Sequence, residues 1–295
     1  MKIAGAPISW GVCEVPGWGH QLGRDRVLAE MRDLGLTATE LGPEGFLPAS
    51  PAERGALLGA YGLRAVGGFV PVVLHDPGRD PVAGLRPLLE SFREGGIEVM
   101  VLAAATGMEG YDTRPVLGGD GWEALLGSLD RVLKEAADGG GPLVTLHPHV
   151  GTMVETRDDV RRVLDGCAVS LCLDTGHLLI GGTDPLEIVR DAPGRVAHAH
   201  LKDVDAALAE QVGAGRLTYT QAVAKGIYRP LGTGDVDVAG IVARLGVAGY
   251  GGWYVMEQDV VLGRDPEKDP EKDPEKGEGP VRDVRASMDY LKGLS

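Results

Sequence analysis

Residues 196–202 read Val-Ala-His-Ala-His-Leu-Lys, and this alternation of apolar and polar side chains decides the fold. Successive side chains of a strand point to opposite faces, so His198, His200 and Lys202 share one face and the small apolar residues share the other. We expect the apolar face to pack against helices and the polar face to point into the interior of the fold.

The same alternation recurs in three further segments. Each places a set of polar or mixed side chains on one face: Thr145, His147 and His149 in residues 143–149; Ser170, Cys172 and Asp174 in 169–174; Trp253, Val255 and Glu257 in 253–257. Four consecutive strands with the same polarity predict that these faces converge on one mouth.

Short apolar runs alternate with amphipathic helical patterns from end to end. The predicted strands are Lys2–Trp10, Ala38–Gly42, Arg64–Leu74, Glu98–Ala105, Leu143–His149, Val169–Asp174, Val196–Lys202 and Trp253–Glu257. The predicted helices include Arg24–Leu34, Trp122–Ala137, Asp158–Leu164, Pro185–Arg190, Val238–Leu245 and Val281–Leu294. Eight strand–helix units predict an α/β fold, a single (β/α)8 TIM barrel over residues 1–295. The alternative is a doubly wound open sheet, but the first strand is not followed by its Gly-rich phosphate loop.

Two segments interrupt this pattern. Residues 205–230 form an insertion after the seventh strand, with a predicted helix at Ala206–Val212, and could serve as a lid or an oligomer contact. Residues 263–280 contain three tandem Asp-Pro-Glu-Lys copies, whose prolines interrupt helix and whose side chains cannot be buried. We expect a flexible, solvated loop there.

Composition narrows the function. The chain has 295 residues with 29 Lys and Arg against 43 Asp and Glu, a net charge of −14. Such a field repels phosphate backbones and anionic membranes, so we expect no nucleic-acid or membrane partner. Three cysteines without Cys-x-x-Cys spacing indicate neither a zinc finger nor a disulfide framework. With no apolar segment long enough for a leader or a membrane span, we expect a cytoplasmic protein, and a homo-oligomer is compatible with the sequence.

Titratable side chains at one barrel mouth indicate a metal. Asp174, His200 and Glu257 come from three neighbouring predicted strands, and Glu155 lies in the loop after the fifth strand. Three carboxylates and one imidazole favour Mn²⁺, Mg²⁺ or Co²⁺, with Zn²⁺ also compatible. We therefore expect one divalent metal, with Mn²⁺ or Co²⁺ preferred.

Four segments resemble a known family. They are Ala6–Gly11 (Ala-Pro-Ile-Ser-Trp-Gly), His147–Glu155, Asp174–His177 and His200–Asp203, which occur in order along nearly the whole chain. Together they resemble the xylose-isomerase-like sugar isomerase/epimerase superfamily, and within it the inosose dehydratase branch most closely.

The resemblance implies a set of site residues. It carries over the metal ligands Glu155, Asp174, His200 and Glu257, and a substrate-binding His177. In the ketose-epimerase branch the first glutamate lies at the tip of strand five, where this chain has His147, and Glu155 follows eight residues later. This departure makes a standard ketose epimerase the less fitting interpretation.

The expected activity is metal-dependent dehydration of a keto-inositol by proton abstraction next to a carbonyl. We assign catalysis to Glu155, Glu257 and Lys202, and assign contacts with a polyol or sugar substrate to a second group: His147, His149, His177, Glu40 and Trp10. A ketose isomerase or epimerase would use the same metal site. An endonuclease IV-like nuclease would need a basic groove, and a non-catalytic sugar-binding barrel would not need the full ligand set.

Several of these residues also have structural interpretations. Thr152 and Glu155 fit a capping box, and Asp174 fits a simple Asx turn. Five more residues also fit purely structural roles. Trp10 fits a core position, Glu40 a turn cap and Lys202 a surface position. His198 fits a hydrogen-bonded core residue, and Cys172 fits a small buried side chain.

Overall fold

The computed structural model describes residues 1–263 and 279–294, and within them eight parallel strands close into a barrel. The barrel strands are β1 (Lys2–Gly5), β2 (Ala38–Glu40), β3 (Arg64–Val72), β4 (Val99–Ala104), β5 (Leu143–Leu146), β6 (Ser170–Asp174), β7 (Val196–Leu201) and β10 (Trp253–Met256). Their order around the barrel is β1-β10-β7-β6-β5-β4-β3-β2, so the predicted TIM barrel is confirmed.

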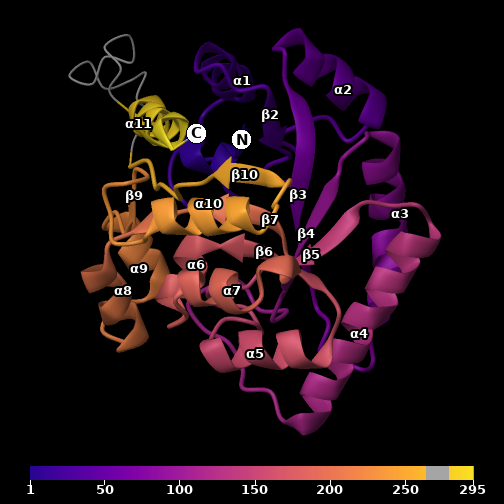
Figure 1. The fold of residues 1–295 in the computed structure, drawn as a ribbon. Coiled ribbons are helices and arrows are strands. Elements are labelled where there is room, and N and C mark those ends of the chain that lie inside the picture. The colour runs from indigo at the N-terminus through magenta and orange to yellow at the C-terminus, as the bar shows by residue number, and fades with distance from the viewer. Residues whose placement is uncertain (264–278, 295) are drawn as a thin grey trace.

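Helices surround this barrel in the order of the chain (Figure 1). They are α1 (Arg24–Asp33), α2 (Pro51–Ala60), α3 (Pro81–Glu94), α4 (Gly119–Asp138), α5 (Arg157–Gly166), α6 (Thr175–Ile180), α7 (Pro185–Asp191), α8 (Ala206–Gly213), α9 (Tyr219–Ala224), α10 (Val238–Val247) and α11 (Pro280–Gly293). Short 3₁₀ turns occupy Pro7–Trp10 and Pro193–Arg195. No helix within the described residues is long and apolar enough to cross a bilayer.

All the predicted strands except the sixth, which ends at Asp174 as predicted, are longer than the observed ones at their carboxyl ends. The first ends at Gly5, because Pro7 begins a 3₁₀ turn with its fixed φ at the first turn. The fifth ends at Leu146, so His147 and His149 lie beyond β5. These residues therefore belong to the loops at the barrel mouth, where TIM-barrel enzymes place their active sites.

Burial confirms which strand face points inward. The apolar residues between the polar ones, such as Leu171, Leu173, Ala199 and Leu201, belong to the large core under the helices. Two small separate clusters fill the interior of the barrel: Ala4, Ala6, Ala38, Val66, Trp253 and Val255 in one, and Val99, Val101 and Cys172 in the other. The interior of the barrel is thus apolar away from the mouth and polar near the mouth.

The insertion at residues 205–230 is more structured than the sequence indicates. The predicted helix is confirmed as α8, and the insertion also holds α9 and β9 (Tyr228–Arg229). β9 pairs antiparallel with β8 (Asp203–Val204), which directly follows β7. α8 packs against α6, so the insertion lies beside the mouth (Figure 1). Of the predicted flexible loop at residues 263–280, positions 264–278 lie outside the described residues.

Candidate active site

Asp174, the last residue of β6, is fixed by the helix that follows it. Its Oδ1 accepts hydrogen bonds from the backbone N–H groups of Gly176 (2.9 Å) and His177 (2.8 Å) at the start of α6. Its Oδ2 remains directed at the mouth, 3.2 Å from Nε2 of His147. Burial alone would raise the pKa of Asp174, but Lys202 and the neighbouring histidines hold it well below its usual range. The carboxylate of Asp174 therefore forms the Asx-type turn with one oxygen and faces the site with the other.

Glu40, at the end of β2, orients two histidines of β7. Its Oε1 accepts hydrogen bonds from Nε2 of His198 (2.8 Å) and Nε2 of His200 (3.0 Å). Gly67 on β3 makes room for this carboxylate, since a Cβ there would lie 2.8 Å from Oε1. His198 is therefore a hydrogen-bonded interior residue, which agrees with its structural interpretation.

The hydrogen bond to Glu40 leaves the other ring nitrogen of His200 facing the mouth. Nδ1 lies 3.2 Å from Oε2 of Glu257 and 3.7 Å from Oδ2 of Asp174. It is buried and has no aligned hydrogen-bond partner. A histidine held by a carboxylate on one nitrogen, with the other nitrogen turned toward two further carboxylates, is the arrangement of a metal-ligating histidine.

Asp174, His200 and Glu257 fit a divalent metal. One ligand atom from each lies within 4.8 Å of the other two. The unpartnered Nδ1 of His200 gives an independent reason for this fit, because buried polar atoms otherwise find a partner. Two carboxylates and one imidazole suit Mn²⁺, Co²⁺, Mg²⁺ or Zn²⁺.

Glu155 is not brought to this cluster. Its Oε2 accepts from the backbone N–H of Gly151 (2.8 Å) and pairs with Nε of Arg114 (3.2 Å). Glu155 also belongs to none of the groups of potential metal ligands among the described residues. The geometry therefore does not support Glu155 as the first metal ligand or as a catalytic residue.

The predicted capping box at Thr152 and Glu155 is wrong. α5 begins at Arg157, and its N-cap is Thr156, which forms a capping box with Asp159. Thr152 instead donates its hydroxyl to the backbone oxygen of His149 at 2.8 Å. A second Thr-x-x-acid pattern, Thr156 and Asp159, stands four residues later, and the helix begins at this second pattern. Asp159 also forms an ion pair with Arg114.

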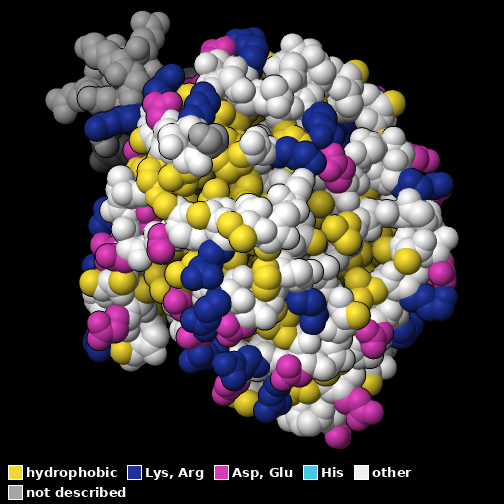
Figure 2. All heavy atoms as spheres, in the orientation of Figure 1, with side chains coloured by type: hydrophobic (Ala, Val, Ile, Leu, Met, Phe, Trp, Pro, Cys, Tyr) yellow, Lys and Arg dark blue, Asp and Glu magenta, His cyan; other side chains and the backbone are white. Residues whose placement is uncertain are grey.

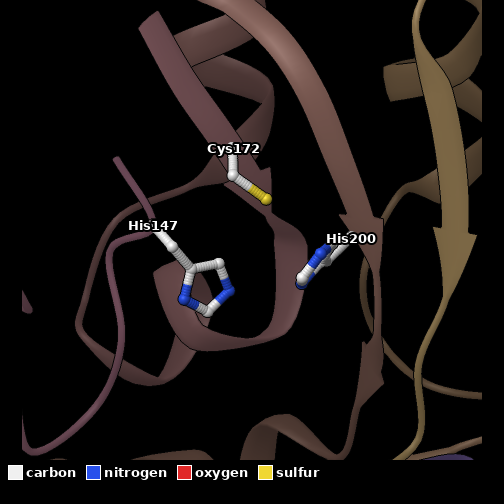
Figure 3. Close-up of side chains that lie close together, drawn as sticks. All are labelled: His147, Cys172 and His200. Carbon is white, nitrogen blue, oxygen red and sulfur yellow. The ribbon is translucent and has the colours of Figure 1, made fainter. Parts of the chain in front are cut away.

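His147 occupies the place beside Asp174 that Glu155 does not reach. Figure 3 shows His147, Cys172 and His200 converging from three neighbouring segments of the barrel, and one atom of each lies within 4.8 Å of the others. Burial raises the pKa of the Cys172 thiol to about 12, so this side chain stays a neutral thiol. The interpretation of Cys172 as a small buried residue agrees with this position.

Lys202 is buried in the mouth, which excludes its surface interpretation. Its Nζ lies 2.8 Å from Asp259, 3.1 Å from Glu257 and 3.1 Å from Nε2 of His177. Thr175 fixes the backbone, since its hydroxyl donates to the Lys202 oxygen at 2.6 Å. Burial alone would lower the pKa of Lys202, but the surrounding carboxylates raise it well above its ordinary value. The side chain is therefore a stable ammonium.

Aromatic rings form one wall of the site. The rings of His149 and His177 stack with centroids 3.7 Å apart, and Tyr111 lies 4.5 Å from His149. Burial holds the pKa of both histidines well below the usual value, so they are neutral donor–acceptor groups. Trp10 does not join this wall: it is fully buried in the core, where its Nε1 donates to Glu30 of α1 at 2.7 Å.

Sequence reasoning missed four residues of this site. They are Tyr111 in the β4–α4 loop, Tyr219 and Tyr228 of the insertion, and Asp259 after β10. The spacing of Asp259, two residues beyond Glu257, was a usable indication, because it continues the same alternation. Tyr111 lies in a loop, and Tyr219 and Tyr228 lie in a helix and a strand too short to show a periodic pattern.

Comparison with known proteins identifies the family to which this chain belongs. The sequence pattern of the xylose isomerase-like TIM barrel family matches residues 28–292. The chain belongs to this family. It is 32% identical over 272 residues to an inosose dehydratase of Geobacillus kaustophilus (strain HTA426), covering 88% of this chain and 87% of that protein. It is also 34% identical over 269 residues to the rhizopine catabolism protein MocC of Rhizobium meliloti, covering 88% of this chain and 82% of that protein.

Solved structures of similar proteins share the fold. The probable 3-DHS dehydratase AsbF of Bacillus anthracis superposes with a TM-score of 0.69 at 14% identity, covering 99% of both chains. An L-ribulose 3-epimerase gives a TM-score of 0.69 at 15% identity, covering 99% of this chain and 94% of its own. The IolI protein, solved with a zinc atom, gives 0.66 at 14% identity, covering 100% and 98%. At these identities the likeness supports the barrel alone.

Proposed function

We propose that this protein is a divalent-metal-dependent dehydratase that removes water from a keto-inositol. The relative from Geobacillus kaustophilus is named an inosose dehydratase, and the match covers 88% of this chain. The observation that carries the choice of reaction is Lys202, a buried ammonium 3.1 Å from Glu257. Water loss needs a proton donor for the departing hydroxyl as well as a base for the carbon-bound proton.

Asp174, His200 and Glu257 would hold the metal, with His147 as the neighbouring fourth group in place of Glu155. His147 Nε2 lies 3.2 Å from Oδ2 of Asp174 and so faces the same space. A second imidazole keeps Mn²⁺ and Co²⁺ suitable and increases the fit to Zn²⁺. When bound, a divalent cation supplies positive charge that stabilises the negative charge developing on the substrate's carbonyl oxygen.

Glu257 and Lys202 divide the proton transfers between them. Glu257 takes the proton from the carbon next to the carbonyl, and Lys202 gives a proton to the hydroxyl that leaves as water. The substrate thus loses one hydrogen and one hydroxyl group. Oε2 of Glu257 and Nζ of Lys202 are 3.1 Å apart, so the proton held by Glu257 can pass directly to the neutral amine. That transfer restores both groups for the next turnover.

The neutral His149 and His177 suit a polyhydroxylated ring. Nδ1 of His149 donates to the Val150 backbone oxygen at 2.6 Å, which leaves Nε2 as an acceptor for a substrate hydroxyl, and the stacked rings offer a flat apolar surface. His177 also lies 3.1 Å from Lys202, which places the hydroxyl-binding wall beside the proton donor. This geometry supports the proposed substrate contacts through these histidines.

A ketose epimerase is the alternative use of the same site. Epimerisation begins with the same proton removal but returns a proton to carbon, and it needs no donor to a departing oxygen. A nuclease is disfavoured by the net charge of −14, and on the visible face basic and acidic side chains are interspersed (Figure 2).

The test is an assay of purified protein, stripped of metal and then supplied with Mn²⁺, Co²⁺, Mg²⁺ or Zn²⁺. A panel of keto-inositols is followed for water loss, and a panel of ketoses for epimerisation. We expect metal-restored loss of water from at least one keto-inositol. Ketose epimerisation without any loss of water would overturn the proposal in favour of the alternative.

Lys202→Met tests the division of roles. It keeps the aliphatic stem and removes the ammonium, so water loss should fall by roughly 10²–10⁴-fold, the usual span of general acid catalysis. Exchange of the substrate's acidic C–H with solvent deuterium should remain measurable, because Glu257 is retained. Lys225→Met, at an exposed lysine of the insertion, is the matched control. Exchange and elimination falling together would show that Lys202 serves binding or enolisation instead.

A further inference from the structure

Asp259 is a buried carboxylate that the proposed chemistry leaves without a task. It follows β10 two residues after Glu257 and is 6% exposed. Its Oδ1 forms an ion pair with Nζ of Lys202 at 2.8 Å, a shorter contact than those from Nζ to Glu257 (3.1 Å) and Asp174 (3.6 Å). Its Oδ2 accepts a hydrogen bond from the hydroxyl of Tyr219 at 2.9 Å. One carboxylate therefore links the ammonium to the insertion.

Tyr219 is the first residue of α9, and a second tyrosine fixes its hydroxyl. The hydroxyl groups of Tyr219 and Tyr228 lie 3.0 Å apart, and the Tyr228 ring lies 5.1 Å from Nζ of Lys202. Tyr228 reaches this position because β9 pairs with β8, with Val204 opposite Tyr228. The insertion thus surrounds the ammonium with one aromatic face and one hydroxyl-bound carboxylate.

Two further contacts show that the insertion packs tightly against the mouth of the barrel. Gly176, at the start of α6, leaves the space in which Lys202 and Tyr228 meet, since a Cβ there would lie 2.7 Å from Lys202 Cβ and 2.9 Å from Tyr228 Cε1. The backbone N–H of Thr220, next to Tyr219, donates to Asp112 of the β4–α4 loop at 2.8 Å. α9 is therefore held from both sides of the mouth.

We propose that Asp259 and Tyr219 are positioning residues that hold the Lys202 ammonium in the mouth, so that the insertion at residues 205–230 completes the proton-donating part of the active site. This inference rests on the proposed role of Lys202 as the donor to the departing hydroxyl. Glu257 and Asp174 are engaged by other tasks in that proposal, and Asp259 is the carboxylate left to fix the amine. A donor misplaced by about 1 Å loses on the order of 10²-fold in rate.

The first experiment needs no activity. Thermal unfolding is compared for the wild type, Lys202→Met, Asp259→Asn and the double variant. Either single change leaves a buried charge without its closest partner, so the double variant should lose less in Tm than the sum of the two single losses. Additive losses would show that the two side chains do not act as a pair and would overturn the inference.

The second experiment removes one hydroxyl group. Tyr219→Phe keeps the ring and both charges, and Tyr250→Phe removes a hydroxyl that donates to the Trp253 backbone oxygen at 2.7 Å, away from this network. With Tyr219→Phe we expect kcat for water loss to fall about 10-fold to 10²-fold at nearly constant KM. Tyr250→Phe should leave kcat close to that of the wild type.

A background lacking the ammonium separates positioning from a structural role. In Lys202→Met protein, Tyr219→Phe should cause no further fall in water loss, because the group that it positions is gone. An equal fall in both backgrounds, or an unchanged kcat in the wild-type background, would contradict the inference. Absence of water loss in the wild type would instead refute the proposed function, while the unfolding comparison still decides whether Lys202 and Asp259 form the pair.

Discussion

Glu40→Gln should weaken metal binding although it substitutes none of the predicted ligands. Oε1 of Glu40 accepts from Nε2 of both His198 and His200, at 2.8 and 3.0 Å. Those bonds set the tautomer of His200, so that Nδ1 faces Asp174 and Glu257. Glutamine has nearly the same shape but no charge, and its amide brings two donors into a buried place that already holds two N–H donors. The substitution therefore keeps the shape of the side chain and weakens its hydrogen bonds to the histidine pair.

The size of the effect follows from the two hydrogen bonds. A hydrogen bond to a charged group contributes about 1.5–3 kcal/mol, and a neutral one about 0.5–1.5 kcal/mol. Two bonds that each lose about 1 kcal/mol give about 2 kcal/mol in all. Removal of a partner that orients a metal-ligating histidine typically weakens metal affinity by about 10–100-fold, or about 1.4–2.7 kcal/mol. The two routes agree.

Calorimetric titration of metal-stripped protein with Mn²⁺ or Co²⁺ measures this directly. Glu44→Gln, at an exposed position in the loop after β2, is the matched control and should leave the Kd unchanged. A Kd for Glu40→Gln within twofold of the wild type, with an unaltered Tm, would refute the reasoning. It would show that Nδ1 of His200 is not directed by Glu40 toward a metal.

Three further predictions follow from the same geometry. Asp174→Ala should lose the bound metal while circular dichroism shows a retained fold, because one hard ligand is removed; a full metal equivalent in that variant would contradict the assignment. Gly176→Ala should cost about 1–3 kcal/mol in denaturant unfolding through contact with Lys202 and Tyr228, whereas Gly213→Ala, which meets nothing within 4 Å, should be near neutral. Cys172 should resist alkylation in the folded protein at neutral pH, since burial raises its pKa to about 12; mass spectrometry showing labelling as fast as in denatured protein would oppose this.

The eight strand–helix units in the sequence were sufficient for the barrel, and the alternation within four of the strands was sufficient for the inward faces. A period of two is a local property, and it assigns His198, His200 and Lys202 to the interior without any information on strand pairing. The buried apolar residues between them make the opposite face unambiguous. The sequence also shows the insertion, as a segment too long for a simple loop. Of its elements, the sequence predicts only α8.

The position of Glu155 outside the cluster has a local cause that the pattern does not reveal. Two Thr-x-x-acid patterns stand side by side, and the second begins the helix through Thr156 and Asp159. Glu155 is then left to bind the Gly151 N–H and Arg114. Its distance in sequence from Asp174 gives no information on which loop residue reaches the mouth.

By itself, the sequence determined the fold class, the strand faces, and three residues that cluster in the mouth: Asp174, His200 and Glu257. Only the tertiary structure decided that Glu40 binds His198 across 158 residues of chain, and that Tyr219 and Asp259 reach Lys202. The physical reason is that these contacts depend on closure of the barrel and on register. The register shifts between Thr39 and Glu40 and again between Leu171 and Cys172, and such shifts leave no mark on a period of two.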